Sequence, residues 1–148
     1  MRVIDLDRCV PGSQATRRGE TVGGFTFRGT SFADFVAHAE AACPREACGL
    51  GVGERRGDAV LLHAYYPVEN LATDDDRFDL DPGEVVRCER LARERGWDVA
   101  GVCHSHVEAP AEPSRADEEG GWPGTDTVIA EVRAGRVVAV RVFRTRAE

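Results

Sequence analysis

The stretch DVAGVCHSHVEAPAEPSRAD, residues 98–117, carries most of the information about architecture and raises the question of function. Its first ten residues are predicted to form a strand, because the apolar residues before the histidines supply the bulk of a buried strand. Side chains alternate along a strand, so His104 and His106 project from one face and Cys103 projects into the core behind it. A short helix is predicted at residues 114–119. The stretch therefore predicts a strand that delivers two imidazoles, followed by a helix.

The polar side chains of this stretch have a functional and a structural interpretation. His104 and His106 offer two of the three protein ligands of a catalytic zinc site; alternatively they are two polar residues where the chain leaves the sheet. Ser114 and Asp117 match the Ser-x-x-Asp pattern of a capping box, in which each side chain satisfies a free backbone N–H. The helix dipole would also hold the Asp117 carboxylate ionised, which suits a third zinc ligand. One carboxylate is not expected to do both jobs, so both interpretations stay open.

A set of two histidines and one aspartate would leave the fourth tetrahedral position of zinc to water, and zinc lowers the pKa of that water toward about 7. Hydrolysis of an amide also needs a base that takes a proton and delivers it to the leaving amine. Glutamate is the usual choice, and the chain has 26 acidic residues. Composition therefore does not select the base.

Outside this stretch, hydrophobic patterns predict a mixed order of helices and strands. Ser31 is expected to be the N-cap of the first helix, and Gly96 is expected to stop the second. Residues 1–24, rich in Gly, Ser and charge, are expected to be an arm or loop, and residues 25–148 a single domain. This order predicts an α+β (α/β-like) fold, with a curved mixed sheet flanked by helices. The predicted elements are strands at 24–29, 46–54, 58–70, 126–132 and 136–143, helices at 31–42 and 83–95, and an acidic loop at 71–82.

Composition narrows the class of protein. A chain of 148 residues with 42% hydrophobic and 30% charged residues is typical of a soluble globular protein with one core. The net charge of −7 argues against a nucleic-acid partner, and the C-terminal arginines, Arg133 to Arg146, are expected on the solvent face of a strand. No apolar run approaches the roughly 18 residues that cross a membrane, and no signal peptide is recognised. Five cysteines without a CxxC pair fit reduced thiols, so a cytoplasmic protein is expected.

Two segments together resemble a known family. Residues 104–117, HSHVEAPAEPSRAD, match the His-x-His, seven residues, Ser-x-x-Asp signature of the JAMM (MPN+) zinc metalloproteases of the small prokaryotic type. Upstream, residues 43–54, CPREACGLGVGE, resemble the family's Pro-x-Glu-x-Cys-Gly-Leu segment. The resemblance extends over residues 25–144 and implies the JAMM/MPN-like, cytidine-deaminase-like fold. Further segments that resemble the family are YYPVENLA, DRFDLDPGEV and GWPGTDTVIAEV.

The resemblance implies a role for each residue of the motif. Glu46 would be the general base and acid, and Ser114 would hydrogen-bond the oxyanion of the tetrahedral intermediate. The family commonly has proline after the second histidine, where this chain has Val107, so the resemblance is weaker in the loop 107–112. One zinc ion per chain would be bound by His104, His106 and Asp117.

The function implied by the resemblance is that of a zinc-dependent peptidase. Small prokaryotic members process ubiquitin-like sulfur-carrier proteins, trimming residues after a Gly-Gly end or releasing an attached amino acid such as cysteine. A hydrolase acting at the C-terminal tail of such a protein is therefore expected. The alternatives are an isopeptidase that removes ubiquitin-like modifiers from lysine, and a non-catalytic MPN-type scaffold module. An intact Glu46 beside three ligands argues against the scaffold, because scaffolding needs no base.

Several other polar residues have structural interpretations. Asn70 is a candidate contact for the substrate backbone, although a turn role suits it equally well. Residues 74–76 are expected to be a solvated acidic loop. Cys48 is expected to pack in the core rather than line the site, and His38 and His63 are expected to be structural or surface residues.

Overall fold

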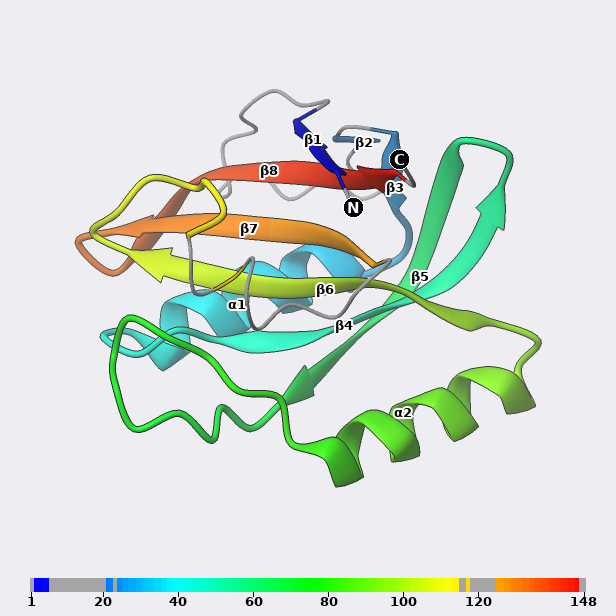
Figure 1. Ribbon diagram of the computed structural model, residues 1–148, viewed down its shortest axis with the longest axis horizontal. Helices are drawn as coiled ribbons and strands as arrows, with labels where there is room; N and C mark the ends of the chain where they lie inside the picture. Colours follow the sequence, from blue (N-terminus) through cyan, green and yellow to red (C-terminus); the bar gives the residue numbers. More distant parts are fainter. Residues whose placement is uncertain (1, 6–20, 23, 115–116, 118–124, 147–148) are drawn as a thin grey trace.

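A single mixed sheet organises the molecule (Figure 1). The computed structural model describes residues 2–5, 21–22, 24–114, 117 and 125–146. Over these residues the strand order is β1-β8-β7-β6-β4-β5-β3-β2, with β6 parallel to β7, β3 parallel to β5, and the other neighbours antiparallel. The strands are β1 (Arg2–Asp5), β2 (Thr21–Val22), β3 (Phe25–Phe27), β4 (Cys48–Arg56), β5 (Ala59–Val68), β6 (Asp98–Val107), β7 (Asp126–Arg133) and β8 (Arg136–Arg146), and the helices are α1 (Ser31–Ala42) and α2 (Pro82–Glu94). The predicted α+β fold with a mixed sheet is confirmed.

Helix α1 covers one face of the sheet and contributes to the larger hydrophobic core. The prediction that Ser31 caps this helix was wrong by one residue, because the N-cap is Thr30. The Ser31 hydroxyl donates to the carbonyl of Arg28 (2.8 Å), so it is tied to the preceding strand instead of to a helical N–H. The Thr30 hydroxyl donates to the Asp34 carboxylate (2.9 Å). The buried side chains along the helix are Phe32, Phe35, Val36 and Ala39.

Helix α2 covers part of the opposite face. Its N-cap, Asp81, accepts a hydrogen bond from the N–H of Gly83 (2.9 Å), and Pro82 takes the first helical position, where its missing N–H costs nothing. Gly96, with a φ of 74°, follows the C-cap, as predicted. The inner side of α2 buries Cys88 and Ala92, which belong to a second core cluster with Leu50 and Val102 of the sheet. None of the described helices is long and apolar enough to cross a membrane.

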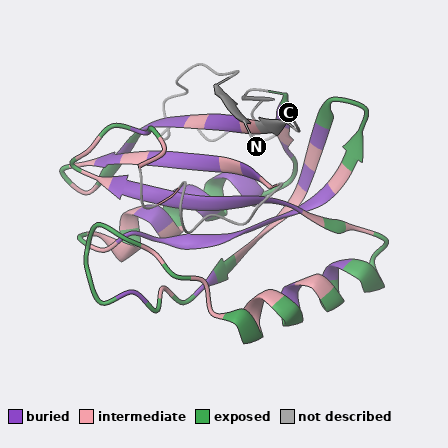
Figure 2. Cartoon of the chain, viewed as in Figure 1, coloured by how far each residue is buried: buried purple, intermediate pink, exposed green. Residues whose placement is uncertain are grey.

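The central strands are buried on both faces, as Figure 2 shows for β4, β6 and β7. Strand β4 alternates glycine with larger residues because β5 side chains lie across the glycines. A Cβ at Gly49 would overlap the ring of Tyr65, and one at Gly51 would lie 2.9 Å from Cδ2 of Leu62. The glycines therefore let β5 side chains fill the space against β4.

The N-terminal segment was predicted to be wholly an arm or loop, and this was wrong for two parts of it. Strand β1 pairs with β8, and β2 pairs with β3, so both extend the sheet at its edges. Such short segments carry little local signal, because the neighbouring strand, far away in the sequence, supplies their hydrogen-bond partners. Residues 6–20 lie outside the described part of the chain.

Candidate metal centre

The two histidines lie on one face of the sheet, between the part that α2 covers and the part that the loop after β6 covers. His104 and His106 project from the same face of β6 as Val102, and Val102 packs with Cys88 and Ala92 of α2. On the other side of β6, this face is covered by the loop after the strand, whose Ala111 packs on Ile129 and Phe143 of β7 and β8. The histidines therefore lie between α2 and this loop, at the end of a central strand.

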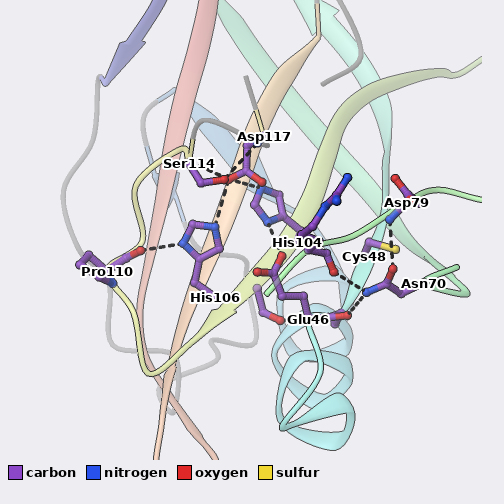
Figure 3. Close-up of polar contacts among 12 residues, drawn as sticks. Glu46, Cys48, Asn70, Asp79, His104, His106, Pro110, Ser114 and Asp117 are labelled. Carbon is purple, nitrogen blue, oxygen red and sulfur yellow. Dashed lines mark hydrogen bonds and ion pairs between the residues drawn. The ribbon is translucent and has the colours of Figure 1, made fainter. Parts of the chain in front are cut away.

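Four side chains converge at this point: Glu46, His104, His106 and Asp117 (Figure 3). One possible ligand atom from each lies within 4.8 Å of all the others. Strand pairing brings Glu46 in, because Cys48, two residues later, lies opposite His104. Nε2 of His106 is 3.0 Å from Oδ2 of Asp117, and Nε2 of His104 is 3.7 Å from the same oxygen. On its other side, Nδ1 of His104 is 3.7 Å from Oε1 of Glu46.

The cluster has the properties of a cation site. Both nitrogens of His104 and Oε1 of Glu46 are buried and have no hydrogen-bond partner among the described residues. Buried polar atoms are almost always satisfied, so these atoms are suited to coordinating a cation. The hydrogen bond from His106 to the Pro110 carbonyl (2.7 Å at Nδ1) favours the tautomer that leaves an Nε2 lone pair facing Asp117. Two nitrogens and one carboxylate oxygen are a donor set that zinc accepts.

The electrostatics of the pair agree with this geometry. Burial lowers the pKa of His106, but hydrogen bonds to Asp117 and to the Pro110 carbonyl outweigh it and raise the pKa above its ordinary value. Burial would raise the pKa of Asp117, but the hydrogen bond with His106, the nearby His104 and the N–H of Ser114 together lower it to about 2. Asp117 is therefore an ionised carboxylate at neutral pH, whether or not a cation is bound.

Asp117 is both a capping residue and a member of the cluster. The N–H of Ser114 donates to Oδ2 of Asp117 (2.8 Å), and the N–H of Asp117 donates to Oγ of Ser114 (3.0 Å), which completes the capping box. The capping box does not exclude a bond to a metal, because a carboxylate has about four lone-pair sites on its two oxygens. Whether Asp117 is also a zinc ligand stays a prediction. Oγ of Ser114 acts as an acceptor in this box, so its own hydrogen is left to donate elsewhere. The rest of the predicted helix at 114–119 lies outside the described residues.

Asn70 differs from its predicted role. Its Nδ2 donates to the carbonyls of Glu46 (2.9 Å) and Arg77 (2.9 Å), and its Oδ1 accepts from the N–H groups of Ala72 (2.9 Å) and Asp79 (3.0 Å). These four bonds use the full capacity of the amide. The side chain is therefore not available to a substrate backbone, and the alternative turn role is the one that the structure shows.

The remaining sequence-predicted residues lie outside the cluster or pack behind it. Cys103 is fully buried on the α1 side, as predicted, and burial raises the pKa of its thiol far above the ordinary value. Burial, with a contribution from Glu46, raises the pKa of Cys48 to about 12, so this thiol is a neutral packing group. His38 hydrogen-bonds the Tyr65 hydroxyl (2.6 Å), and His63 hydrogen-bonds the Glu54 carboxylate (2.7 Å).

One contact at the cluster has no counterpart in the sequence prediction. The ring of Phe78 stacks on the ring of His104, with centroids 4.4 Å apart and an angle of 26°. Phe78 lies in the loop between β5 and α2, and nothing in its local pattern distinguishes it from a loop aromatic. Only the resemblance of the segment DRFDLDPGEV to the family drew attention to this part of the chain.

A cavity of about 290 Å³ opens beside the cluster. Glu46, His106 and Ser114 lie on its wall, so it reaches the reactive groups directly. Asp75 and Asp76 are exposed, as a solvated loop requires, and they also line this cavity. The full lining is Pro44, Glu46, Asp75, Asp76, His106, Val107, Ala109 and Ser114.

The comparisons with known proteins identify the family of the chain. The chain belongs to the prokaryotic homologs of the JAB domain, a family whose sequence pattern matches residues 30–144. This confirms the resemblance to small prokaryotic JAMM proteins.

Two curated relatives carry names of activities. A desampylase of Haloferax volcanii is 37% identical over 83 residues, which are 55% of this chain and 58% of that protein. A CysO-cysteine peptidase of Mycobacterium tuberculosis is 33% identical over 82 residues, which are 55% of each chain. The chain thus spans little more than half the length of these relatives.

Solved structures match over a longer region. A protein of Desulfitobacterium hafniense is 32% identical, with a TM-score of 0.70 and coverage of 78% of this chain and 80% of the other. A protein of Salinibacter ruber is 31% identical, with a TM-score of 0.59 and coverage of 77% of each chain. These likenesses support the fold across most of the described residues.

Proposed function

We propose that this chain is a zinc-dependent peptidase that hydrolyses an amide bond at the C-terminal tail of a ubiquitin-like, sulfur-carrier type of protein. The observation that carries the proposal is the buried cluster of Glu46, His104, His106 and Asp117, with its unpartnered nitrogen and oxygen atoms. Membership of the JAB family and the relatives named desampylase and CysO-cysteine peptidase support both the reaction and the class of substrate.

In this proposal His104, His106 and Asp117 hold the metal. Asp117 contributes an ionised carboxylate, and the Pro110 carbonyl orients the ring of His106. Stacking against Phe78 orients the ring of His104. When bound, zinc polarises the scissile carbonyl and lowers the pKa of water.

Glu46 is the general base and acid of the proposed reaction. Its side chain is 5% exposed, its Oε1 has no hydrogen-bond partner among the described residues, and it lies on the wall of the cavity. The carboxylate takes a proton from the attacking water and delivers it to the leaving amine. Its position is fixed through the backbone, because the Glu46 carbonyl accepts from the amide of Asn70.

Ser114 supplies the remaining polar group. Its oxygen already accepts the N–H of Asp117, and its hydroxyl hydrogen is directed by no hydrogen bond to the described part of the chain. Ser114 lines the same cavity as Glu46, so its hydroxyl can donate to the oxyanion that develops on the scissile carbonyl. The helix cap and the oxyanion contact thus use opposite sides of one hydroxyl group.

The proposal is tested first by metal content. The purified chain is expected to hold one zinc per molecule by elemental analysis, and Asp117→Ala is expected to hold far less, because one of three ligands is gone. Asp74→Ala, at an exposed position outside the cluster, is the matched control and should retain wild-type zinc. Full zinc occupancy in Asp117→Ala would remove Asp117 from the ligand set.

The second test is activity. The zinc-loaded chain is incubated with a ubiquitin-like sulfur-carrier protein that bears a C-terminal amide extension, and release of the extension is followed by mass spectrometry. We expect release that stops when a chelator removes zinc. A chain that holds zinc but cleaves no such extension would be a binding module instead of a peptidase.

A further inference from the structure

The cavity beside the cluster is unusually acidic in its lining. Among its described lining residues are the carboxylates of Glu46, Asp75 and Asp76, and no lysine or arginine. Asp75 and Asp76 form no ion pair or side-chain hydrogen bond with the part of the chain that the structure describes, whereas Asp74 lies 3.9 Å from Arg77. The negative charge of this wall is therefore not neutralised by any of the described residues.

Among the described residues, the arginine next to Glu46 is directed away from the cavity. Arg45 adjoins Glu46 in the sequence, but its guanidinium donates to the backbone carbonyls of Asn70 and Ala72. It therefore anchors the start of the loop between β5 and α2 and does not line the cavity.

The two aspartates are held in a fixed relation to Glu46. The amide of Asn70 binds the loop on both sides of Asp75 and Asp76, through the N–H of Ala72 and the carbonyl of Arg77. The same amide donates to the carbonyl of Glu46. The acidic part of the loop and the strand that carries the base are thus joined through one side chain.

If Glu46 is the general acid of the proposed reaction, its position indicates which part of a substrate meets this wall. The Glu46 side chain is only 5% exposed, and Glu46 lines the cavity. Its Oε1 has no hydrogen-bond partner among the described residues. A group that protonates a leaving amine must come within hydrogen-bond reach of that nitrogen, about 2.6–3.2 Å. In the proposed reaction the scissile nitrogen would lie beside Glu46, and the group attached to it would extend into the cavity that Glu46 shares with Asp75 and Asp76.

We infer that Asp75 and Asp76 determine specificity for the leaving group, selecting an amine that carries positive charge close to the scissile nitrogen and disfavouring one that carries a carboxylate. The inference rests on the proposed peptidase function and adds the charge of the leaving group to its substrate class. A free amino acid released through its α-nitrogen bears its carboxylate on the adjacent carbon, so the wall repels it. A basic peptide or protein segment presents cations to the same wall and is attracted.

The test uses three substrates with one acyl part. A ubiquitin-like sulfur-carrier protein is joined through its C-terminal carboxyl group to the α-nitrogen of lysine amide, norleucine amide or glutamate amide. Norleucine has the apolar stem of lysine without its charge. For the wild-type chain we expect kcat/KM to be about tenfold higher for lysine amide than for glutamate amide, with norleucine amide between them. The ratio should shrink in high salt, because these carboxylates are exposed.

The double variant D75N/D76N should reduce the lysine-to-glutamate ratio to within about twofold, since both charges are gone. The matched control D74N removes a neighbouring charge that is absent from the cavity wall, and it should keep the wild-type ratio. Thermal melting of each variant checks that the fold is intact, and exposed Asp→Asn changes are mild.

The outcomes distinguish a failure of the charge selection from a failure of the peptidase function. Hydrolysis of all three substrates at similar kcat/KM, or an unchanged ratio in D75N/D76N, would overturn the charge selection and leave the peptidase function standing. Hydrolysis of none of them by the zinc-loaded wild-type chain would overturn the peptidase function and the specificity with it.

Discussion

Two buried polar clusters lie toward opposite ends of the central strands, and they differ in what they leave unsatisfied. At one end, Asp126 is 2% exposed and its Oδ2 lies 3.1 Å from Nη1 of Arg55 and 2.8 Å from Nε of Arg144. At the other end, His104 is fully buried and both of its ring nitrogens lack a hydrogen-bond partner among the described residues. In the first cluster the buried carboxylate has its partners within the chain. The second has buried polar atoms that the described residues leave unsatisfied, and it fits a metal.

The difference separates a polar cluster whose ion pairs join strands of the sheet from one that fits a metal. A buried carboxylate between two arginines ties β7 to β4 and β8, so its loss would remove the ion pairs that join these strands. A buried imidazole without a partner is costly unless a ligand satisfies it. The two ends of the sheet therefore differ less in burial than in whether their buried polar atoms have partners among the described residues.

The largest effect is expected from Glu46→Gln, which keeps the size of the side chain and removes its basicity. Turnover should fall by roughly 10²- to 10⁴-fold, the usual contribution of general acid–base catalysis. Zinc content and melting temperature should stay near wild type, because Glu46 holds neither the fold nor the metal in this proposal. Wild-type turnover in Glu46→Gln would assign the base to another residue.

Ser114→Ala should have the next largest effect, on turnover more than on stability. Loss of an oxyanion donor costs roughly 10²- to 10³-fold in turnover, whereas loss of a helix cap costs about 1 kcal/mol of unfolding free energy. Steady-state kinetics and thermal melting measure the two contributions separately, and zinc content should remain normal.

Ser114→Asp is the companion variant. It can still cap the helix, but it places a negative charge beside the developing oxyanion, so it should be no better a catalyst than Ser114→Ala. Recovery of turnover in Ser114→Asp would show that Ser114 is only a cap.

Asp126→Ala should change stability and leave the metal site intact. We expect the free energy of unfolding to fall by about 2 kcal/mol in urea denaturation, less than for a fully buried pair because the Arg55 side chain is 45% exposed. The zinc content of the folded fraction should stay at one per chain. A large loss of zinc with unchanged stability would reverse the roles that we assign to the two clusters.

The smallest effect is expected from Phe78→Leu, which removes the aromatic ring stacked on His104 and keeps an apolar side chain. Aromatic contacts of this kind contribute about 1 kcal/mol, so zinc affinity in a chelator competition should fall about fivefold. Val138→Ala, at an exposed position on β8, is the control and should not change affinity. An unchanged affinity in Phe78→Leu would mean that the loop does not orient His104.

The end of the sheet that holds the two histidines was more predictable from sequence than the end that holds Asp126. Alternation along β6 predicts that His104 and His106 share a face, and the spacing to Asp117 adds a third donor on the next element. Glu46 is one of 26 acidic residues and was identified only through the resemblance to the family. Local periodicity thus accounts for the histidines but not for the base.

The arginine–aspartate cluster was missed because its members are distant in the sequence. Arg55 and Asp126 are 71 positions apart, and Arg144 is a further 18 positions along the chain. Arg144 was expected on the solvent face of a strand, but its side chain is 12% exposed, because it turns toward the buried carboxylate at the start of β7. Which strands become neighbours decides such a contact, and strand order is not encoded in any short pattern.

The crowding of Gly49 under the Tyr65 ring has a consequence for the history of this chain. Glycine in the segment Cys48–Leu50 looks like part of a reactive motif, yet its side-chain-free position serves the packing of a neighbouring strand. A mutation that gives position 49 a methyl group is accommodated only after position 65 has become smaller. The two positions must therefore change in a set order, and lineages that keep the tyrosine are confined to glycine opposite it.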